Sequence, residues 1–260
     1  MLAFIGCEAR LQDWPVTDTI SAMELFNDLL PDPLPAEPMA LASAWLATAL
    51  AARQQPNPDA MILATATTDG RPSARVVLCK EFDVENGRVS FVTNYDSRKG
   101  RELAVNARAA LVFHWDHSHR QIRIEGVVVK SPPAESDEYF ASRNWQRRVG
   151  AWASAQSRPL TSREQLNAAV RAAAEKFGAP VPTLDNINQA PAVDIPRPSF
   201  WGGFHVWADA VELWIEGASR IHERARWTRE LTTSGGNLPG DAGSVSITGG
   251  SPWSSTRLQP

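Results

Sequence analysis

Apolar residues spaced three and four apart predict helices at several points along the chain. The first follows the proline-rich segment 31–38, where the apolar side chains from Met39 to Ala49 fall on one face. Two more helices are predicted over 97–106 and 132–143. A fourth is predicted after residue 161, so helices punctuate the chain without dominating it.

Capping signals mark the ends of the last two predicted helices. Ser131 stands as an N-cap before Pro132, which suits the first helical position. Thr161-Ser162-Arg163-Glu164 fits a capping box, and Gly178 stands where a C-cap glycine is expected. Between them one apolar face is formed by Leu166, Ala169, Val170, Ala173 and Phe177.

Short apolar or alternating segments predict strands through the middle and the end of the chain. Thr68-Asp69-Gly70 is a hairpin turn between the first two, and 121–130 alternates, with Ile122, Ile124 and Val128 on one side. The predicted strands are 61–67, 73–82, 88–93, 109–115, 121–130 and a late pair at 204–207 and 211–215. Closely spaced short strands favour an α+β fold built on an antiparallel barrel.

The pattern favours one domain, over residues 36–260. Residues 1–35 are interpreted as a mobile N-terminal extension, and the opening MLAFIGCEARLQDW lacks the basic region of a signal peptide. The proline-rich segment 179–198 is interpreted as a surface linker. The Gly/Ser/Thr-rich segment 232–251 is interpreted as a flexible insertion.

Composition narrows the classes of function. The formal net charge is −3, so no bulk nucleic-acid binding is expected and any anion site must be local. No apolar run reaches the roughly 18 residues of a transmembrane helix. Two cysteines, Cys7 and Cys79, make neither a disulfide framework nor a zinc ribbon, and they predict reduced thiols in a cytoplasmic protein.

One segment, Asp96-Ser97-Arg98-Lys99-Gly100, indicates an anion site. Cations in the first turn of a helix oppose the helix dipole, which is unfavourable unless an anion binds there. Arg98 and Lys99 are therefore candidate phosphate ligands, with side chains that simply reach solvent as the alternative.

Two other pairs of polar residues are candidates. Arg75 and Lys80 stand an odd number of residues apart, so a bulge or a strand end is needed if both serve one site. Tyr139 and Arg143 share a helix face at i and i+4, as a solvated pair also would. The histidines of 114–119 match no zinc motif, and we interpret that stretch as a polar hairpin loop with no metal.

Together the segments resemble the pyridoxamine 5'-phosphate oxidase family, over about residues 36–260. The matching motifs, in order, are RPSARVVLCK (71–80), FVTNYDSRKG (91–100), RQIRIEG (120–126), EYFASR (138–143), GAWASAQS (150–157), RPSFWGGF (197–204), ASRIHERARW (218–227) and TRLQP (256–260). The resemblance implies a split β-barrel with peripheral helices that works as a homodimer, with FMN at the subunit interface.

Site residues follow from the resemblance motif by motif. The implied FMN contacts are Arg75, Val76, Val77, Leu78, Cys79, Lys80, Val92, Thr93, Arg98, Lys99, Gln121, Gln156, Ser157, Trp201 and Arg224. The implied substrate contacts are Lys80, Tyr139, Arg143, Arg220 and His222, of which Arg220 and His222 lie over the substrate ring as the catalytic pair.

The implied reaction oxidises pyridoxamine or pyridoxine 5'-phosphate to pyridoxal 5'-phosphate by hydride transfer from C4' to flavin N5. Dioxygen then accepts the electrons and becomes hydrogen peroxide. The cofactor supplies the redox chemistry, and the protein orients the substrate by charge-assisted bonds to its phosphate.

Arg147 is a further candidate substrate contact, and there the chain departs from the family pattern, because a serine usually contacts the substrate phosphate at that position. An outward-pointing Arg147 is favoured here, because an inward one would face two other cations in the empty site. The family's N-terminal lid residues also have no clear match in 14–34. Two alternatives stay open: a related oxidase of the phenazine-biosynthesis type acting on another anionic ring, and a non-catalytic flavin or pyridoxal phosphate carrier.

Overall fold

A single curled antiparallel sheet organises the protein. The structure is a computed structural model that describes residues 28–186, 189, 191, 193–234, 242 and 246–260. Seven strands run in the spatial order β11-β8-β7-β6-β5-β1-β2, and β4 joins through β7 and carries β3 at its side. These strands are β1 (Ala60–Ala66), β2 (Pro72–Leu78), β3 (Glu81–Asp83), β4 (Arg88–Asn94), β5 (Arg108–Trp115), β6 (Arg120–Lys130), β7 (Trp201–Ile215), β8 (Glu223–Thr228) and β11 (Ser254–Arg257).

The predicted antiparallel strands are confirmed, with two corrections. The strand expected at 73–82 is divided into β2, which pairs with β1, and β3, which pairs with β4. The pair expected at 204–207 and 211–215 is one continuous strand, β7. The chain does not turn at Asp209, because its carbonyl oxygen accepts from the Arg229 N–H and its carboxylate pairs with Arg108. A register shift at Gly126 of β6 accommodates the long strand. A Cβ on Gly126 would lie 2.0 Å from the carbonyl oxygen of Trp207, so only glycine fits there.

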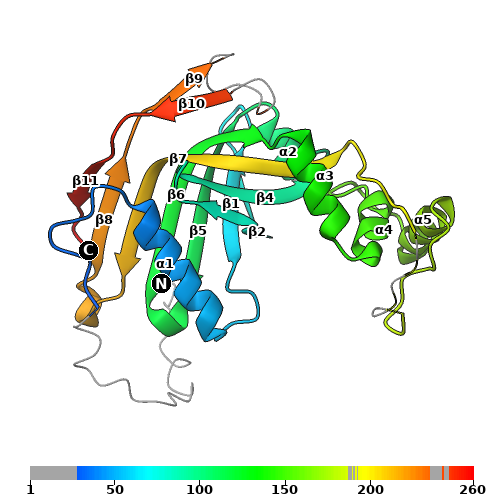
Figure 1. Ribbon diagram of the computed structural model, residues 1–260, viewed down its shortest axis with the longest axis horizontal. Coiled ribbons are helices and arrows are strands. Elements are labelled where there is room, and N and C mark those ends of the chain that lie inside the picture. Colours follow the sequence, from blue (N-terminus) through cyan, green and yellow to red (C-terminus); the bar gives the residue numbers. More distant parts are fainter. Residues whose placement is uncertain (1–27, 187–188, 190, 192, 235–241, 243–245) are drawn as a thin grey trace, which may run out of the picture.

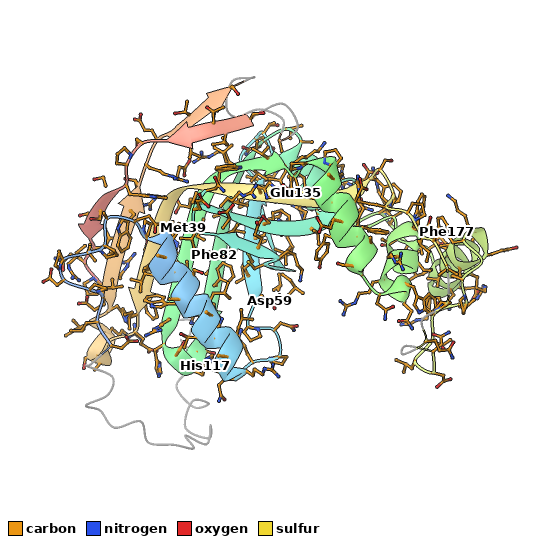
Figure 2. The ribbon with its side chains drawn as sticks, in the orientation of Figure 1. Met39, Asp59, Phe82, His117, Glu135 and Phe177 are labelled. Atoms are coloured by element: carbon orange, nitrogen blue, oxygen red, sulfur yellow. The ribbon has the colours of Figure 1, made fainter. Side chains whose placement is uncertain are left out.

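Five α-helices lie around the sheet in the described part of the chain. They are α1 (Met39–Ala52), α2 (Arg98–Leu103), α3 (Pro133–Ser142), α4 (Trp145–Ala153) and α5 (Arg163–Lys176). Helix α1 crosses one side of the sheet, with Met39 at its upper end, while α3 packs against β7 and α4 and α5 extend beyond it (Figures 1 and 2). Helix α4 was not predicted from the sequence.

The capping predictions hold only in part. The N-cap of α5 is Ser162, whose Oγ accepts from the Gln165 N–H at 3.1 Å, so the box lies one residue later than predicted. Gly178 has a φ of +61°, as its C-terminal role requires. Ser131 is not the cap of α3, because Pro132 occupies that position and no side chain caps it.

The protein has two hydrophobic clusters. The larger fills the sheet beneath α1 and includes the fully buried Phe91, Phe113 and Trp227. The smaller joins α4 to α5 around Trp145, Val149, Ala173, Ala174 and Ile195. The described part of 179–198 holds no helix or strand, but it is more than a surface linker. Ile195 is buried there, and the carbonyl oxygens of Gln189 and Pro196 accept from the indole N–H groups of Trp145 and Trp152.

Two other predicted irregular regions are also partly built into the fold. Residues 1–27 lie outside the described part, but Leu30 is buried and Asp28 binds Arg120 with two 2.9 Å hydrogen bonds, so the boundary at 35 is too late. Most of the predicted insertion at 232–251 also lies outside the described residues. Its flanks form a hairpin of β9 (Leu231–Ser234) and β10 (Ser246–Gly250), and Ala242 is fully buried.

Candidate functional site

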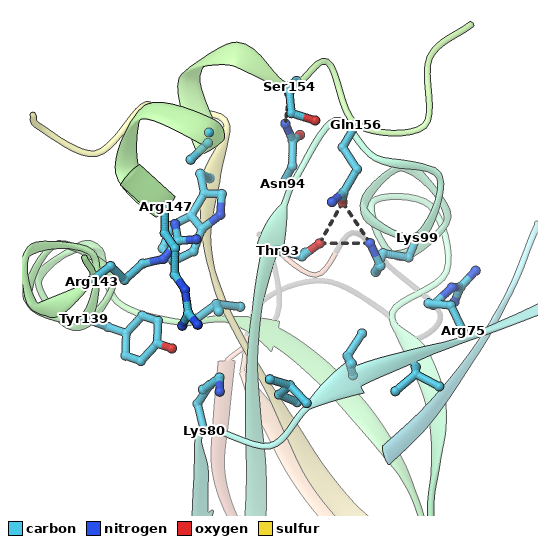
Figure 3. A pocket seen from close by; sticks show the side chains of 17 residues that line it. Arg75, Lys80, Thr93, Asn94, Lys99, Tyr139, Arg143, Arg147, Ser154 and Gln156 are labelled. Atoms are coloured by element: carbon cyan, nitrogen blue, oxygen red, sulfur yellow. Dashed lines mark hydrogen bonds between the residues drawn. The ribbon is translucent and has the colours of Figure 1, made fainter. Parts of the chain in front are cut away.

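A cavity of about 630 Å³ opens between the β2–β4 side of the sheet and helices α2, α3 and α4. Figure 3 shows the side chains that surround it. They are Arg75, Val76, Val77, Leu78, Lys80, Val92, Thr93, Asn94, Lys99, Tyr139, Arg143, Arg147, Gly150, Ala151, Ser154, Gln156 and Trp201. Thirteen sequence-predicted residues are thereby brought together around one space.

The lining of this cavity holds five cations and no carboxylate. The cations are Arg75, Lys80, Lys99, Arg143 and Arg147. Strand β2 ends at Leu78, and this strand end brings Arg75 and Lys80 to one site despite their odd spacing. A local concentration of positive charge in a chain of net charge −3 is typical of a site for a multiply charged anion.

Lys99 stands at one corner of the cavity in a compact polar cluster. Its Nζ donates to Thr93 Oγ1 and to Gln156 Oε1, both at 2.9 Å (Figure 3). Burial lowers the pKa of Lys99, and the neighbouring Arg75 lowers it further, to about 8. An anion beside Lys99 would favour the charged ammonium, so this corner suits a phosphate. Helix α2 has only six residues, so a phosphate here would be held by these side chains rather than by the helix dipole.

A buried carboxylate behind the cavity holds Arg75 in place. Glu102 accepts from Ser73 Oγ at 2.6 Å and from Arg98 Nε at 2.9 Å, and it lies 3.4 Å from Arg75 Nη2. Burial alone would raise the pKa of Glu102, but these hydrogen bonds, one from Thr65 and the charge of Arg75 lower it to about 2. Glu102 therefore stays ionised and fixes the Arg75 guanidinium at the cavity wall.

The opposite wall presents an arginine without a protein partner for one of its nitrogens. The Arg143 guanidinium lies 4.6 Å from the centre of the Trp201 ring, and the Tyr139 ring stacks on the same indole at 6.2 Å. Its Nη1 atom is buried and makes no hydrogen bond. Burial lowers the pKa of Arg143, and the charge of Arg147 lowers it further. An unpaired buried donor of this kind is costly unless a ligand accepts from it.

The preference for an outward Arg147 is wrong. Arg147 lies on α4 and lines the same cavity as Arg143 and Lys80 (Figure 3). It is exposed at the rim, where it also borders a second cavity with Pro182, Thr183 and Leu184. Helix α4, which was not predicted from the sequence, places this side chain at the cavity rim.

Five predicted FMN contacts do not line the cavity, and three of them are sequence neighbours of residues that do. Arg98 is more than half exposed and binds Glu102 through Nε, which leaves its two Nη groups without a partner in the described structure. Cys79 is buried, and burial raises the pKa of its thiol to about 12. Ser157 is exposed with a φ of +67°, beside Gln156.

Four other predicted residues gather elsewhere, at the β6–β7–β8 end of the sheet. Gln121 is the second residue of β6, Arg224 lies in β8, and Arg220 and His222 lie in the turn before β8. Figure 1 shows this turn far from α3 and α4. Arg220 has a φ of +65°, an uncommon conformation for a side-chain-bearing residue that is held at functional turns. One protomer therefore does not bring all the predicted residues into one cavity.

Trp214 belongs to this second group and was missed. It pairs in register with Gln121 and Arg224, and its ring lies 4.7 Å from that of His222. The signal in the sequence was a tryptophan six residues before Arg220, within the predicted strand 211–215 and just outside the motif at 218–227. The cavity residues Asn94, Ser154 and Gly150 were also missed, the last two because α4 and its end were not predicted.

The histidine-rich loop carries no metal centre in the described structure. His117 lies in a short 3-10 turn between β5 and β6 (Figure 2), and no group of three potential ligands occurs among the described residues. No helix of the described chain is long and apolar enough to cross a membrane.

Comparisons with known families agree with this geometry. Residues 47–177 match the family described as pyridoxamine 5'-phosphate oxidase. Residues 201–260 match the pyridoxine 5'-phosphate oxidase C-terminal dimerisation region. The pyridoxine/pyridoxamine 5'-phosphate oxidase of Gluconobacter oxydans (strain 621H) is 44% identical over 87% of this chain and 96% of its own length. That of Burkholderia orbicola (strain MC0-3) is 46% identical over 77% of this chain and 86% of its own.

Solved structures show the same architecture. PhzG from Burkholderia lata 383, in complex with tetrahydrophenazine-1-carboxylic acid, superposes with a TM-score of 0.70 at 32% identity, covering 90% of this chain and 98% of that one. A pyridoxamine 5'-phosphate oxidase-related, FMN binding protein from Nostoc punctiforme PCC 73102 gives 0.57 at 13% identity, covering 86% and 98%. The second shows likeness of fold alone.

The fold is that of a split-barrel protein, and its cavity is lined by five cations and no carboxylate. The chain belongs to the pyridoxamine 5'-phosphate oxidase family. FMN is the cofactor of this family, and the residues of the cavity fit it. Lys99 and Thr93 offer donors for a phosphate, Val76 and Leu78 offer apolar surface, and the buried Nη1 of Arg143 is free to bind a further anion.

Proposed function

We propose that this chain is an FMN-dependent oxidase that converts pyridoxamine 5'-phosphate or pyridoxine 5'-phosphate to pyridoxal 5'-phosphate, with dioxygen as acceptor and hydrogen peroxide as product. The observation that carries the proposal is the cavity with five cations, no carboxylate and an unpaired buried arginine nitrogen. Such a site suits two phosphates, one on the cofactor and one on the substrate.

The two phosphates would bind at different corners of the cavity. Lys99, with Thr93, would hold the FMN phosphate. Lys80, Tyr139 and Arg143 would hold the substrate phosphate by charge-assisted bonds and keep the substrate in one orientation. Arg220 and His222 of a second protomer would lie over the substrate ring. The bound flavin supplies the hydride acceptor and the reaction with dioxygen.

A second candidate function has its own support. Arg147 adds a cation where the family usually has serine, and the PhzG structure holds a carboxylated tricyclic ring. The two candidates separate in an aerobic assay of the purified protein against pyridoxamine 5'-phosphate and against a carboxylated tricyclic ring, with hydrogen peroxide followed in both. Faster turnover of the phosphate substrate supports the proposal, and turnover of the tricyclic ring alone would replace it. No peroxide from either substrate would indicate a carrier.

We expect a homodimer whose two sites each take residues from both protomers. The motivation is the separation of Arg220, His222 and Arg224 from the cavity, together with the match to a dimerisation region. Mixing inactive Arg143→Ala and inactive Arg220→Ala protomers under exchanging conditions should restore about a quarter of wild-type activity, because half of the dimers then carry one intact site of two. No recovery from dimers shown to have exchanged would place each site within one protomer.

Arg147→Ser should raise KM for pyridoxamine 5'-phosphate about tenfold, a change of ~1.4 kcal/mol, with kcat little changed. The physical reason is that the arginine lines the cavity beside Arg143 and grips the bound substrate and transition state alike. Arg148→Ser is the matched control, because Arg148 does not line the cavity. A lower KM in Arg147→Ser would instead show that the serine restores a contact that the arginine blocks.

FMN affinity should fall as the pH rises through about 8, because Lys99 loses its proton there in the empty site. The FMN phosphate stays doubly charged over this range, with a second pKa of about 6. Lys99→Arg keeps its charge and should show a nearly flat affinity from about pH 7 to about pH 9.5 in fluorescence titrations. If FMN affinity depended on pH in the same way in the wild type and in Lys99→Arg, Lys99 would not be a ligand of the FMN phosphate.

A further inference from the structure

A chain of polar side chains crosses the fold directly behind the substrate wall of the cavity. Glu81 of β3 accepts from Ser90 Oγ of β4 at 2.9 Å, and Ser90 Oγ lies 2.7 Å from Nδ1 of His205 in β7. His205 Nε2 lies 2.8 Å from Glu135 Oε2 of α3. His205 is almost fully buried, whereas Glu135 is about half exposed at the side of α3 that approaches β7 (Figure 2).

Both ends of this chain adjoin residues proposed to bind the substrate. Glu81 follows Lys80 in sequence, and Glu135 stands one helical turn before Tyr139 on the same face of α3. A cavity of about 470 Å³ is lined by all four members of the chain and shares Lys80, Val92 and Tyr139 with the substrate cavity. The chain thus joins the helix that carries Tyr139 to the strands that carry Lys80.

When His205 is neutral, the row of contacts from Glu81 to Glu135 has one hydrogen too few to form every hydrogen bond. Its three contacts need three hydrogens, whereas the serine hydroxyl supplies one and a neutral imidazole supplies one. An imidazolium supplies the missing third. In the structure, Nε2 of His205 lies 2.8 Å from Glu135 Oε2 without hydrogen-bond geometry.

We propose that His205 is a positioning residue of the substrate site, and that the Glu81–Ser90–His205–Glu135 chain fastens α3 to the sheet when it takes up one proton. The role in substrate binding rests on the proposed function. Other contacts also hold α3, among them the 3.1 Å bond from the Gly203 N–H to Ser136 Oγ. Proton uptake therefore strengthens the attachment of α3 to the sheet, but α3 stays attached without it.

Several charged groups around His205 set the pH at which this happens. Burial lowers the pKa of His205 and the charge of Arg88 lowers it further, while Glu135 and Glu81 raise it, with a net result below the usual value. Lys80, Glu138, Lys130 and Arg197 also line the cavities on its two sides, but they are not among the groups that shift this pKa. The chain is accordingly incomplete at neutral pH and is completed on acidification.

Glu135→Gln gives the sharpest test. The amide of glutamine can donate N–H to the bare Nε2 of neutral His205, which completes the chain without an added proton. KM for pyridoxamine 5'-phosphate should then be about threefold to tenfold lower than the wild-type value at about pH 8, which is the effect of one hydrogen bond. The two KM values should converge as the pH falls and wild-type His205 takes up its proton. The KM of the variant is divided by the KM of the wild type at the same pH. Protonation of the substrate phosphate affects both values equally and so does not change this ratio.

Two further variants are compared with Glu135→Gln, one that removes the His205 contacts and one that serves as a matched control. His205→Phe keeps a ring but removes both contacts, so its KM relative to wild type should rise as the pH falls from about 8 to about 5.5. Glu138→Gln makes the same chemical change on the same helix, and Glu138 lines the cavity but makes no contact with the chain, so its KM ratio should stay at unity. A flat ratio for Glu135→Gln, or equal behaviour of Glu135→Gln and Glu138→Gln, would overturn the inference.

Hydrogen exchange separates this inference from the proposed function. At about pH 5.5, amides of α3 should exchange faster in the His205→Phe holoenzyme than in wild type, while amides of α1 exchange equally in both. If that holds but pyridoxamine 5'-phosphate is not oxidised, the proton-dependent fastening of α3 stands and the proposed reaction falls. If the substrate is oxidised but α3 exchange is unchanged, the fastening falls alone.

Discussion

Replacing Arg98 and Lys99 together by alanine is expected to weaken FMN binding by about 3–6 kcal/mol, or at least about 100-fold. Each residue would lose a charge-assisted bond to the phosphate, worth ~1.5–3 kcal/mol. Lys99 should carry the larger share, because it lines the cavity, whereas Arg98 is more than half exposed and already binds Glu102. Fluorescence titration of the apoprotein measures the loss.

Arg101→Ala is the matched control for that experiment. Arg101 lies on the same short helix and carries the same charge, but it does not line the cavity. Its removal should leave FMN affinity within about twofold. Riboflavin, which lacks the phosphate, should bind the double variant and the wild type equally. An unchanged FMN affinity in the double variant would remove the proposed phosphate site.

Arg143→Ala is expected to lower kcat/KM for pyridoxamine 5'-phosphate about 100-fold to 1000-fold. Arg143 is held against Trp201, and its Nη1 is buried with no partner in the described protein, so the ligand bond it makes is formed away from competing water. Loss of one partner from such a pair costs about 3–5 kcal/mol. Steady-state kinetics at low substrate concentration measure this loss directly.

Two controls test whether the effect of Arg143→Ala is specific to substrate binding. FMN affinity should be nearly unchanged, because Lys99 and Arg143 stand on opposite walls of the cavity (Figure 3). Arg163→Ala, at the exposed start of α5, should leave both FMN binding and kinetics unaltered. A loss of kcat/KM below threefold in Arg143→Ala would mean that the substrate phosphate lies elsewhere.

Much of the fold could be predicted because its signals are local. The turn at Thr68-Asp69-Gly70 and the alternation in β6 depend only on neighbouring residues, and both are confirmed. Strand β7 was broken in two because nearly all its residues are buried and it shows no alternation. The contacts of Asp209, with Arg108 and Arg229, come from distant parts of the chain that periodicity does not reveal.

The candidate site was predicted unevenly for a similar reason. Lys80, Lys99 and Arg143 were identified from motifs, and the structure brings them to one cavity. The orientation of Arg147 depends on α4, which packs on α5 through Trp145 and Val149 and has little local helix signal, with Gly150 in its middle. Sequence alone also assigns no residue to a particular protomer, so the separation of Arg220 from the cavity became visible only in three dimensions.

The central claim is that the bound flavin oxidises pyridoxamine 5'-phosphate directly. The most direct test mixes the yellow, FMN-loaded protein with one equivalent of this substrate in the absence of oxygen. We predict that the flavin absorbance bleaches and that one equivalent of pyridoxal 5'-phosphate forms per flavin, with one water consumed and one ammonia released. Admission of air should then restore the colour and yield one equivalent of hydrogen peroxide. A flavin that stays oxidised, with no aldehyde formed, would contradict the account.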